Sequence, residues 1–371
     1  MEQVDVVVVG AGIAGAAAAF AISQRHKVCL IERQPQPGTQ ASGRSVTMFA
    51  IAYGDRITRA LSLASRRFFE DPPPGFTDGP LLARRGMLHV ASPGQEEALE
   101  SFLAETKDAG PDLLALDPAA VRAQLPFLRP EMVIGGVLDR AAASIDDHRY
   151  LQACLRGLKA NGGSLRCGVE IRTIEPHGQG FRLQTDSDGL EAAYLVNAAG
   201  AWADEVAGLA GMRPLSLRAL RRTAVTVDPP AGLDPMGWPM AIDVEEAWYV
   251  KPEAGRLLIS PADETEVPPH DVQPEEWDVA VAVDRYEQLT GETVRRIHHR
   301  WAGLRTFTPD RAPVAGRAFG HDRFIWLAGQ GGAGFMTAPA MAEIAAALVD
   351  ERELPPQISL APADLAPGRR L

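Results

Sequence analysis

The sequence predicts an α/β protein. One domain has a parallel sheet and is assembled from separate stretches of the chain, and the other is an α+β domain with a mixed sheet. Three observations support this prediction: a glycine-rich turn between a strand and a helix at the N-terminus, a second glycine cluster near the C-terminus, and alternating strand-like runs between them. A chain of 371 residues exceeds the size at which one hydrophobic core usually stops growing, so two structural units are expected.

The N-terminal segment predicts a Rossmann-like βαβ unit. A β-branched run at residues 4–9 leads directly into the motif GAGIAG, and an Ala-rich helix is expected to about residue 23. Gly10 permits the tight turn, Gly12 lets the backbone approach a pyrophosphate, and Gly15 lets the helix pack closely on the strand. A second strand at residues 28–31 ends in Glu32, which is placed to accept hydrogen bonds from ribose hydroxyls.

The segment after Glu32 favours FAD over NAD. Residues 33–45 are polar and turn-rich, so their amides and hydroxyls can follow a cofactor that extends deeper into the protein. An NAD-binding domain would normally pass directly into another helix and strand. By composition alone, an ordinary surface loop explains this segment equally well.

The second glycine cluster lies near the C-terminus. A buried strand is expected at residues 324–328, followed by the motif GQGGAG and a helix at residues 338–349, with Thr337 as N-cap and Pro339 in the first turn. No strand follows, so a second mononucleotide fold cannot form here. Backbone amides at a helix N-terminus suit the negative charge of a reduced flavin ring. A close packing turn is the alternative, but four glycines in six residues exceed what packing needs.

The middle of the chain completes both predicted domains. A strand at residues 193–199 ends in small side chains, where either a bulky cofactor passes or the chain simply makes a tight turn. Strand-like runs at residues 221–227, 247–250 and 256–259, with a helix at 275–289, predict a mixed sheet over the flavin. The predicted FAD-binding domain comprises residues 1–55, 140–212 and 303–371, and the predicted substrate-binding domain comprises 56–139 and 213–302.

Composition excludes several classes of function. The net charge of −11 disfavours nucleic-acid binding, which needs clustered Lys and Arg. The three cysteines and eight histidines show no metal-ligand or triad spacing, so no metal site or disulfide framework is expected. No apolar stretch is long enough to span a membrane. These features predict a cytoplasmic protein, and leave loose membrane association open.

The sequence resembles the D-amino acid oxidase superfamily of FAD enzymes, and within it the bacterial D-arginine dehydrogenase branch. The matching stretches cover nearly the whole chain and include VVVVGAGIAGA, PGTQASGRS, AIAYG, LVNAAGAWAD, AGLAGMRPL, WYVKPEAG, HDVQPE, WAGLR and GQGGAGF. The resemblance implies noncovalent FAD, because residues 303–310 lack the cysteine through which the related sarcosine oxidases tether flavin. It also implies that residues 50–54 form a mobile lid.

The resemblance assigns a substrate site for an amino acid. Arg222 and Arg305 would pair with the substrate carboxylate, and the hydroxyls of Tyr53 and Tyr249 would donate to it. Hydride transfer from Cα to flavin N5 would give an imino acid, which hydrolyses to a 2-oxo acid and ammonia. Gly332 and its neighbours would stabilise the anion. Arg221, on the opposite face of its strand, is expected to be structural.

Two departures from the branch change the expected substrate. Met48 stands where the branch carries a histidine, and residues 84–87 contain no acid to read a basic side chain. A buried cation without a counter-charge is penalised. The sequence therefore predicts a D-amino acid with an uncharged or apolar side chain, in a pocket lined by Val46, Met48, Met87 and Met240.

Alternatives remain open at this stage. They are a secondary amine such as an N-methyl amino acid, a 2-hydroxy acid on the same scaffold, or a flavin redox sensor without turnover. The electron acceptor is a quinone, an electron-transfer protein or O₂. The residues expected to contact FAD are Gly10, Gly12, Ile13, Ala14, Gly15, Glu32, Arg33, Gln40, Ala41, Ser42, Arg44, Ser45, Val169, Ala199, Gly200, Trp202, Gly331, Gly332, Ala333, Gly334 and Phe335.

Overall fold

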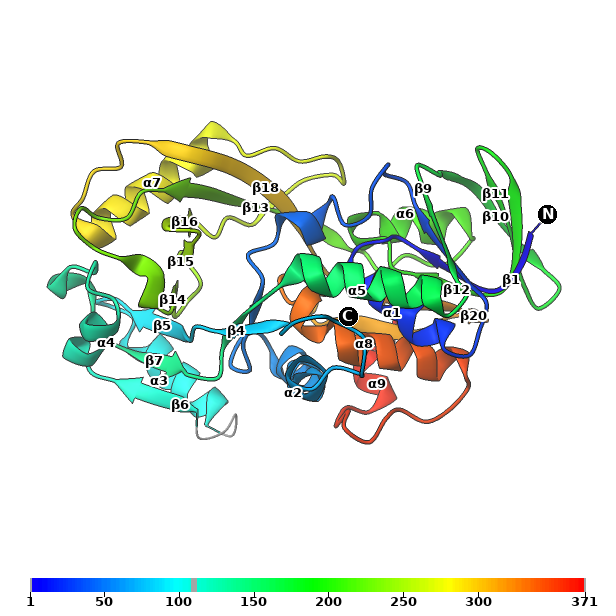
Figure 1. Ribbon diagram of the computed structural model, residues 1–371, viewed down its shortest axis with the longest axis horizontal. Coiled ribbons are helices and arrows are strands. Elements are labelled where there is room, and N and C mark those ends of the chain that lie inside the picture. The colour runs from blue at the N-terminus through cyan, green and yellow to red at the C-terminus, as the bar shows by residue number, and fades with distance from the viewer. Residues whose placement is uncertain (1, 108–111, 370–371) are drawn as a thin grey trace.

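Two large sheets lie at opposite ends of an elongated molecule, with helices packed on each (Figure 1). The computed structural model describes residues 2–107 and 112–369. Within these residues one sheet has eight strands, the other has nine, and a small sheet has three. This arrangement confirms the predicted α/β fold with a mixed second sheet.

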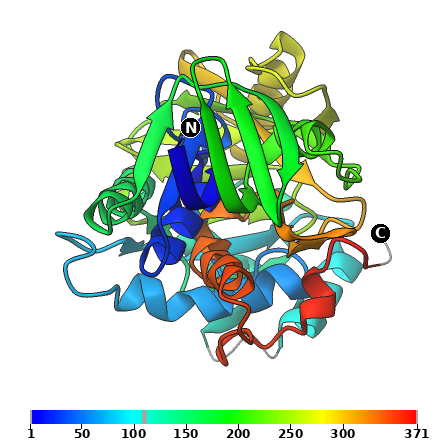
Figure 2. The ribbon, with the colours of Figure 1, turned by 90° about the vertical axis from the view of Figure 1, so that its right-hand side faces the viewer.

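The first sheet has a parallel centre in the order β20, β12, β1, β2, β9. Antiparallel strands β10 and β11 extend it beside β12, and β19 pairs with β20. Figure 2 shows this sheet toward the viewer, with the dark blue N-terminal strand between green strands and the orange-red α8 beneath. The strands are β1 (Glu2–Val9), β2 (Val28–Glu32), β9 (Ser164–Cys167), β10 (Ile171–His177), β11 (Gly180–Thr185), β12 (Gly189–Asn197), β19 (Val314–Ala318) and β20 (His321–Ala328).

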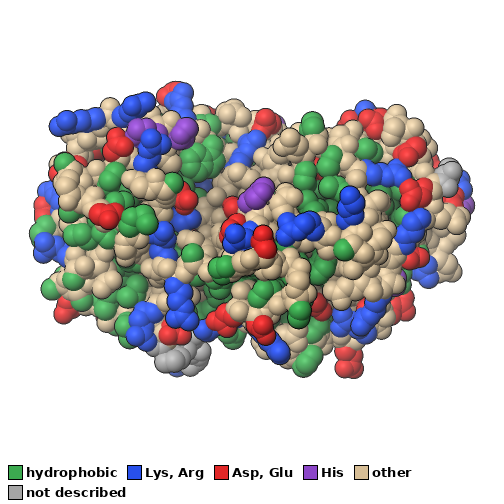
Figure 3. Space-filling model, viewed as in Figure 1, with side chains coloured by type: hydrophobic (Ala, Val, Ile, Leu, Met, Phe, Trp, Pro, Cys, Tyr) green, Lys and Arg blue, Asp and Glu red, His purple; other side chains and the backbone are tan. Residues whose placement is uncertain are grey.

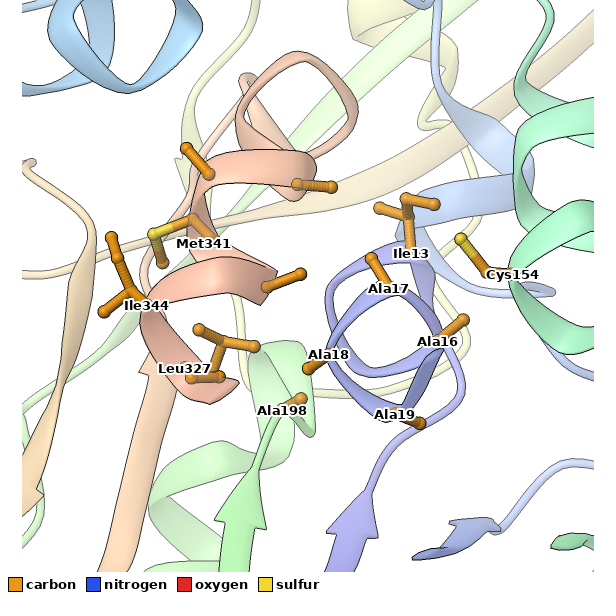
Figure 4. Packing of buried hydrophobic residues seen from close by; sticks show 14 of the residues in the cluster. Ile13, Ala16, Ala17, Ala18, Ala19, Cys154, Ala198, Leu327, Met341 and Ile344 are labelled. Atoms are coloured by element: carbon orange, nitrogen blue, oxygen red, sulfur yellow. The ribbon is translucent and has the colours of Figure 1, made fainter. Parts of the chain in front are cut away.

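Helices cover both faces of this sheet, as expected for parallel strands with apolar residues on both sides. Val6 and Val8 of β1 face one core, and Val7 and Val9 face the other. The helices around the sheet are α1 (Ile13–Ser23), α2 (Arg56–Glu70), α5 (Asp147–Ala160), α6 (Ala203–Leu209) and α8 (Gly334–Val349). The alanines of α1 allow it to pack against both α5 and α8 (Figure 4).

The second sheet is mixed, because β14 runs parallel to β5 while all the other strand pairs of this sheet are antiparallel. Helices α4 (Pro118–Gln124) and α7 (Glu276–Thr290) cover one of its faces. The opposite face carries Ala224, Met240 and Tyr249. The strands are β5 (Met87–Ala91), β6 (Leu113–Leu116), β7 (Gly135–Asp139), β13 (Arg218–Val227), β14 (Met240–Asp243), β15 (Tyr249–Glu253), β16 (Arg256–Ser260), β17 (Thr265–Glu266) and β18 (Ile297–Phe307).

Short elements connect these layers. They are the three-stranded sheet of β3 (Met48–Phe49), β4 (Leu82–Arg84) and β8 (Ala143–Ile145), the helices α3 (Glu96–Thr106) and α9 (Pro362–Leu365), and the 3-10 turns η1 (Ala41–Arg44), η2 (Pro130–Met132), η3 (Gly200–Trp202) and η4 (Pro235–Gly237). Strand β18 continues through residue 303, where the sequence placed a domain junction, so one long strand crosses that position.

One predicted helix boundary is wrong. Helix α8 begins at Gly334 rather than Ala338, and Ala333 is its N-cap residue. Thr337 therefore lies inside the helix, where its hydroxyl donates to the carbonyl of Ala333 at 2.9 Å. Pro339 also lies inside α8 rather than in its first turn.

Charged side chains of both signs lie on the surface of the protein. Acidic and basic side chains are interspersed over the face shown in Figure 3. Across residues 2–107 and 112–369, no helix is both long and apolar enough to cross a bilayer. The same residues contain no group of three or more His, Cys, Asp or Glu side chains placed to hold a metal ion.

Candidate active site

A long cavity runs along the ends of the parallel strands and reaches the face of the second sheet that carries Ala224 and Tyr249. Its walls include every residue predicted to contact FAD except Gly15 and Ala333, and they also include Arg222, Tyr249 and Arg305. The predicted cofactor site and the predicted carboxylate-binding residues Arg222, Tyr249 and Arg305 therefore line one cavity, whereas Tyr53 is not among its lining residues.

The N-terminal glycines shape one end of this cavity. A Cβ on Gly10, whose φ is +99°, would lie 2.5 Å from the Ala198 carbonyl oxygen, and one on Gly15 would lie 1.8 Å from the Gly10 oxygen. Both positions therefore require glycine for packing, which accounts for Gly15 lying outside the cavity wall. Gly12 is more open: the one described atom within 4 Å of an added Cβ is Ser42 Oγ at 3.1 Å.

Glu32 is held at the end of β2 by the backbone. Its Oε2 accepts from the Ala11 amide and its Oε1 from the Gln34 amide, both at 2.8 Å. Each carboxylate oxygen has a further lone pair, so the ribose-binding role predicted for Glu32 is compatible with these bonds.

The wall continues with residues from three different elements. The Arg33 guanidinium lies 4.7 Å from the centre of the Trp202 ring, and the Val169 amide donates to the Glu32 carbonyl at 3.1 Å. Gly200, with φ +56°, has no described atom within 4 Å of an added Cβ. The chain therefore leaves room here for a bulky group.

Arg44 contacts protein groups rather than open space. Its guanidinium donates to the carbonyls of Val272 at 2.8 Å and Ala302 at 3.1 Å, and it forms an ion pair with Asp271. It therefore connects η1 to β18 and to the segment before α7. The backbone and the aliphatic stem of Arg44 remain for the cavity wall.

The C-terminal glycine loop forms a further part of the cavity wall, next to Arg305. The Gly331 amide donates to the Thr306 carbonyl at 2.9 Å, and a Cβ on Gly331, whose φ is +54°, would lie 2.2 Å from the Phe307 ring. Gly332 is adjacent to the substrate site, because a Cβ there would lie 2.8 Å from Arg305 Cζ and 3.0 Å from Tyr53 Oη.

These features fit a dinucleotide with an extended ring system. Helices α1 and α8 both direct their N-termini toward the cavity, and the glycine turns let the backbone approach a ligand closely. The buried Gln330 Nε2 lines the same cavity and has no hydrogen-bond partner among the described residues. A buried donor without a partner is costly, and a bound cofactor would satisfy it.

Two arginines on adjacent strands form the cationic end of the cavity. Leu220 of β13 pairs with Arg305 of β18, so Arg222, two residues further along, lies on the same face as Arg305. Arg222 donates to the Asp263 carbonyl at 2.9 Å and to Glu264 at 3.1 Å. Arg305 donates to Tyr53 Oη at 3.3 Å.

Arg221 lies on the other face, as predicted. It forms ion pairs with Glu275 and with Asp278 of α7, the latter at 2.8 Å, and is therefore a structural residue beneath that helix.

The electrostatics of the arginine pair favour an anionic ligand. Burial and the neighbouring Arg305 charge lower the pKa of Arg222. Burial also disfavours charged Arg305, but Tyr53, Tyr249, Glu246 and Glu264 offset it, so the pKa of Arg305 is raised. Both side chains stay charged at neutral pH and repel each other. A carboxylate between them would relieve that repulsion.

The two tyrosines differ in their hydrogen bonds. Tyr249 Oη is buried and has no partner in the described part of the chain. Tyr53 Oη accepts from Arg305 and donates to Glu246, each at 3.3 Å. Burial, followed by the Glu246 charge, raises the pKa of Tyr53. In this arrangement Tyr249 has a free hydroxyl proton and Tyr53 does not.

The sequence analysis does not identify Glu246, because it considers an acid near the substrate only at residues 84–87. It lies in the turn between β14 and β15, three residues before Tyr249. Its signal in the sequence is an acidic turn next to a predicted site residue. The residue that it contacts, Tyr53, is distant in sequence, so the pairing could not be read from the chain.

The predicted pocket residues divide into two groups. Val46 lines the cavity, whereas Met48, Met87 and Met240 do not. Met87 and Met240 are neighbours on parallel strands and pack in the buried cluster that includes Tyr249, with Met48 at its edge. The methionines therefore form an apolar layer around Tyr249 rather than the wall itself.

Comparison with known proteins identifies the family. The family model for DAO, FAD dependent oxidoreductase, matches residues 5–348. The chain belongs to the DAO family. It is therefore an FAD-dependent oxidoreductase, and FAD is its cofactor.

Two relatives match the chain over spans of different length. The chain is 33% identical over 181 residues to the bifunctional protein MnmC of Maricaulis maris, which covers 47% of the chain and 27% of that longer protein. It is 23% identical to the glycine oxidase of Geobacillus kaustophilus, over 95% of this chain and 94% of that protein.

The solved structures confirm the fold. The glycine oxidase structure from Geobacillus kaustophilus superimposes with a TM-score of 0.86, covering 100% of both chains at 22% identity. The L-α-glycerophosphate oxidase of Mycoplasma pneumoniae, solved with FAD bound, superimposes with a TM-score of 0.85, covering 94% and 95% of the two chains at 19% identity. None of these matched proteins is named as a D-arginine dehydrogenase, so the resemblance to that branch stays a prediction.

Proposed function

We propose that this DAO-family enzyme oxidises the C–N bond of a small amino acid whose carboxylate is held by Arg222 and Arg305. The observation that carries the proposal is the paired guanidiniums beside the free Tyr249 hydroxyl, within the cavity that fits FAD. The amino acid oxidation named for glycine oxidase agrees with this substrate class. A redox sensor without turnover would not need a paired cation site.

The residues of the chain would bind and orient the substrate. Arg222 and Arg305 would hold the carboxylate from two adjacent strands, and Tyr249 would donate its free hydroxyl proton to the same group. Bound FAD supplies the electron-pair acceptor for the hydride that leaves Cα. The amides of Gly332 and its neighbours, near the N-terminus of α8, would stabilise negative charge at that end of the cavity.

The finer substrate assignment follows from the sequence and the apolar layer. We propose a D-amino acid with an uncharged or apolar side chain, in which the D-configuration rests on the resemblance and the side-chain class on the methionine layer around Tyr249. The product would be an imino acid, which hydrolyses to a 2-oxo acid and ammonia. An N-methyl amino acid such as sarcosine is a second candidate, since it offers the same carboxylate and amine.

Anaerobic mixing with a substrate panel tests the proposal. The panel contains D- and L-amino acids with apolar, polar and basic side chains, N-methylglycine and a 2-hydroxy acid, and the measurement is bleaching of the oxidised flavin absorbance. We expect bleaching by an amino acid and its loss in the Arg305→Met variant that still binds FAD. A clear preference for D-arginine or D-lysine would overturn the side-chain assignment, and no bleaching by any amine would overturn the proposed reaction.

A further inference from the structure

The turn between β14 and β15 places next to the cationic site a carboxylate that has no ion-pair partner among the described residues. We propose that Glu246 binds the amino nitrogen of the substrate, so that the enzyme selects amino acids over carboxylic acids that lack an amine. This inference rests on the proposed function, because it assumes that Arg222 and Arg305 hold the substrate carboxylate. It concerns the binding step.

Hydrogen bonds within the turn fix the backbone around Glu246. Its amide donates to the Asp243 carbonyl at 2.9 Å, and its φ of 58° is in the left-handed region. The buried carboxylate of Asp243 accepts from the amides of Glu245 at 3.0 Å and Ala247 at 3.1 Å, and Gln95 Nε2 donates to it at 3.1 Å. A turn with this many internal hydrogen bonds has an ordered backbone before a ligand arrives, which lowers the cost of binding.

Glu246 lacks the cationic partner that nearby acids have. Glu264 is paired with Arg222 at 3.1 Å and with Arg311 at 2.8 Å. By contrast, no Lys, Arg or His nitrogen of the described residues lies within 4.0 Å of the Glu246 carboxylate. A half-buried carboxylate in this position is therefore available to a positively charged ligand.

The hydroxyl of Tyr53 connects this carboxylate to the anion site. Tyr53 Oη lies 3.3 Å from Glu246 Oε2 and 3.3 Å from Arg305 Nη1. The Tyr53 hydroxyl thus lies between Glu246, which can accept from a positive nitrogen, and Arg305, which can donate to a carboxylate. A small amino acid carries an amine and a carboxylate on the same carbon. Such a zwitterion can contact Glu246 and Arg305 at once within normal hydrogen-bond lengths.

The Tyr53 hydroxyl has too few protons to donate to both Glu246 and a substrate carboxylate, so an amine on the substrate is needed to donate to Glu246. Tyr53 has one hydroxyl proton, which it donates to Glu246 in this structure. When an N–H of the substrate bonds to Glu246 instead, the Tyr53 proton is free to turn toward the substrate carboxylate, which is the role that the resemblance assigns to Tyr53. A carboxylic acid without an amine cannot replace that bond, and its negative charge is repelled by Glu246.

A pair of ligands that differ only in the amine tests this inference. 2-Aminoisobutyrate has no Cα–H and cannot be oxidised, and isobutyrate has the same shape without the amine. Dissociation constants are measured on the FAD-loaded enzyme from the change in flavin absorbance. We expect Glu246→Gln to weaken 2-aminoisobutyrate about tenfold, as for loss of one charge-assisted hydrogen bond, and to leave isobutyrate unchanged or bound more tightly.

Glu245→Gln is the matched control. Glu245 is the adjacent acid of the same turn, but it is exposed and accepts from Gln95 Nε2 at 2.8 Å, away from Tyr53. We expect this variant to leave both constants unchanged. In Tyr53→Phe the Glu246 carboxylate remains, so we expect the preference for 2-aminoisobutyrate over isobutyrate to be retained, and this variant keeps the test decisive if Glu246→Gln does not fold.

The outcomes separate this inference from the proposed function. An unchanged ratio of the two constants in Glu246→Gln would overturn the inference while leaving the carboxylate site intact. The same holds if the variant weakens amino acids with basic side chains but not 2-aminoisobutyrate, and if Tyr53→Phe abolishes the preference. If the wild-type enzyme binds neither ligand, the proposed function itself fails.

Discussion

Tyr249 and Tyr53 reach the arginine pair from different elements, and their different hydrogen bonds predict different mutational effects. Tyr249→Phe removes a hydroxyl that has no partner in the described residues, so any bond that it makes with substrate is lost outright. Tyr53→Phe removes a hydroxyl already engaged with Arg305 and Glu246. We expect Tyr249→Phe to lower kcat/KM about two- to tenfold, and Tyr53→Phe to lower it less.

Steady-state kinetics of both variants, with FAD content checked by absorbance, measures this difference. A larger loss in Tyr53→Phe than in Tyr249→Phe would show that Tyr53 is the main donor to the substrate.

Gly332 supports a second prediction at the scale of single residues. A Cβ at this position would lie 2.8 Å from Arg305 Cζ, so Gly332→Ala must displace the guanidinium. We expect kcat/KM to fall about 10- to 100-fold, as for small misplacements of a substrate-binding group, while FAD is retained.

Gly208→Ala on α6 serves as its control, because no described atom lies within 4 Å of an added Cβ and the residue is helical. We expect this variant to be fully active and slightly more stable. Full activity of Gly332→Ala would indicate that Arg305 is not held against this loop.

Among the elements, β5 contains a buried histidine that makes stability depend on pH. His89 packs against Phe102 with ring centres 4.3 Å apart, and burial lowers the pKa of His89 from the ordinary 6.5 to about 3. The unfolded chain therefore binds the proton more tightly than the folded protein. From pH 6.5 down to about 3, this residue should reduce the free energy of unfolding by about 1.4 kcal/mol for each pH unit.

Urea unfolding at several pH values tests this dependence. We expect His89→Leu to lose less stability on acidification than the wild type. His270→Gln should behave like the wild type, since His270 is exposed. Parallel pH profiles for wild type and His89→Leu would contradict the prediction.

The elements also show how far sequence patterns reach. The βαβ unit was predicted to within a few residues, because β-branched runs, glycine spacing and the acid at the end of β2 all act locally. The start of α8 was missed because Pro339 is favoured in a first turn, whereas Phe335 and Met336 are buried and extend the helix toward the glycine loop. The Glu246–Tyr53 contact was missed because only the fold brings these distant residues together.

For the molecule as a whole, the cavity is lined by N-terminal, middle and C-terminal stretches of the chain, so we expect bound FAD to raise the free energy of unfolding. FAD would contact elements from both ends of the chain, because residues of both line the cavity. It would also bind the Gln330 Nε2 group, which has no hydrogen-bond partner among the described residues. Once the concentration of free FAD exceeds its Kd, each further tenfold increase should add about 1.4 kcal/mol to the free energy of unfolding.

Thermal unfolding of the enzyme stripped of FAD and titrated with FAD measures this effect. We expect Tm to rise with FAD concentration, and acid precipitation to release the yellow colour into the supernatant. A Tm that does not depend on FAD, or colour that stays with the precipitated protein, would contradict noncovalent binding.

The packing of α1 against α8 joins the two ends of the chain, since residues 13–23 lie beside residues 334–349 (Figure 4). Helix α1 packs directly on α8, so the face of α1 at this contact stays uncovered until α8 has been synthesised. On the ribosome, this apolar face of α1 therefore lacks its packing partner until residues 334–349 have been translated. During that interval, it is a natural target for chaperones.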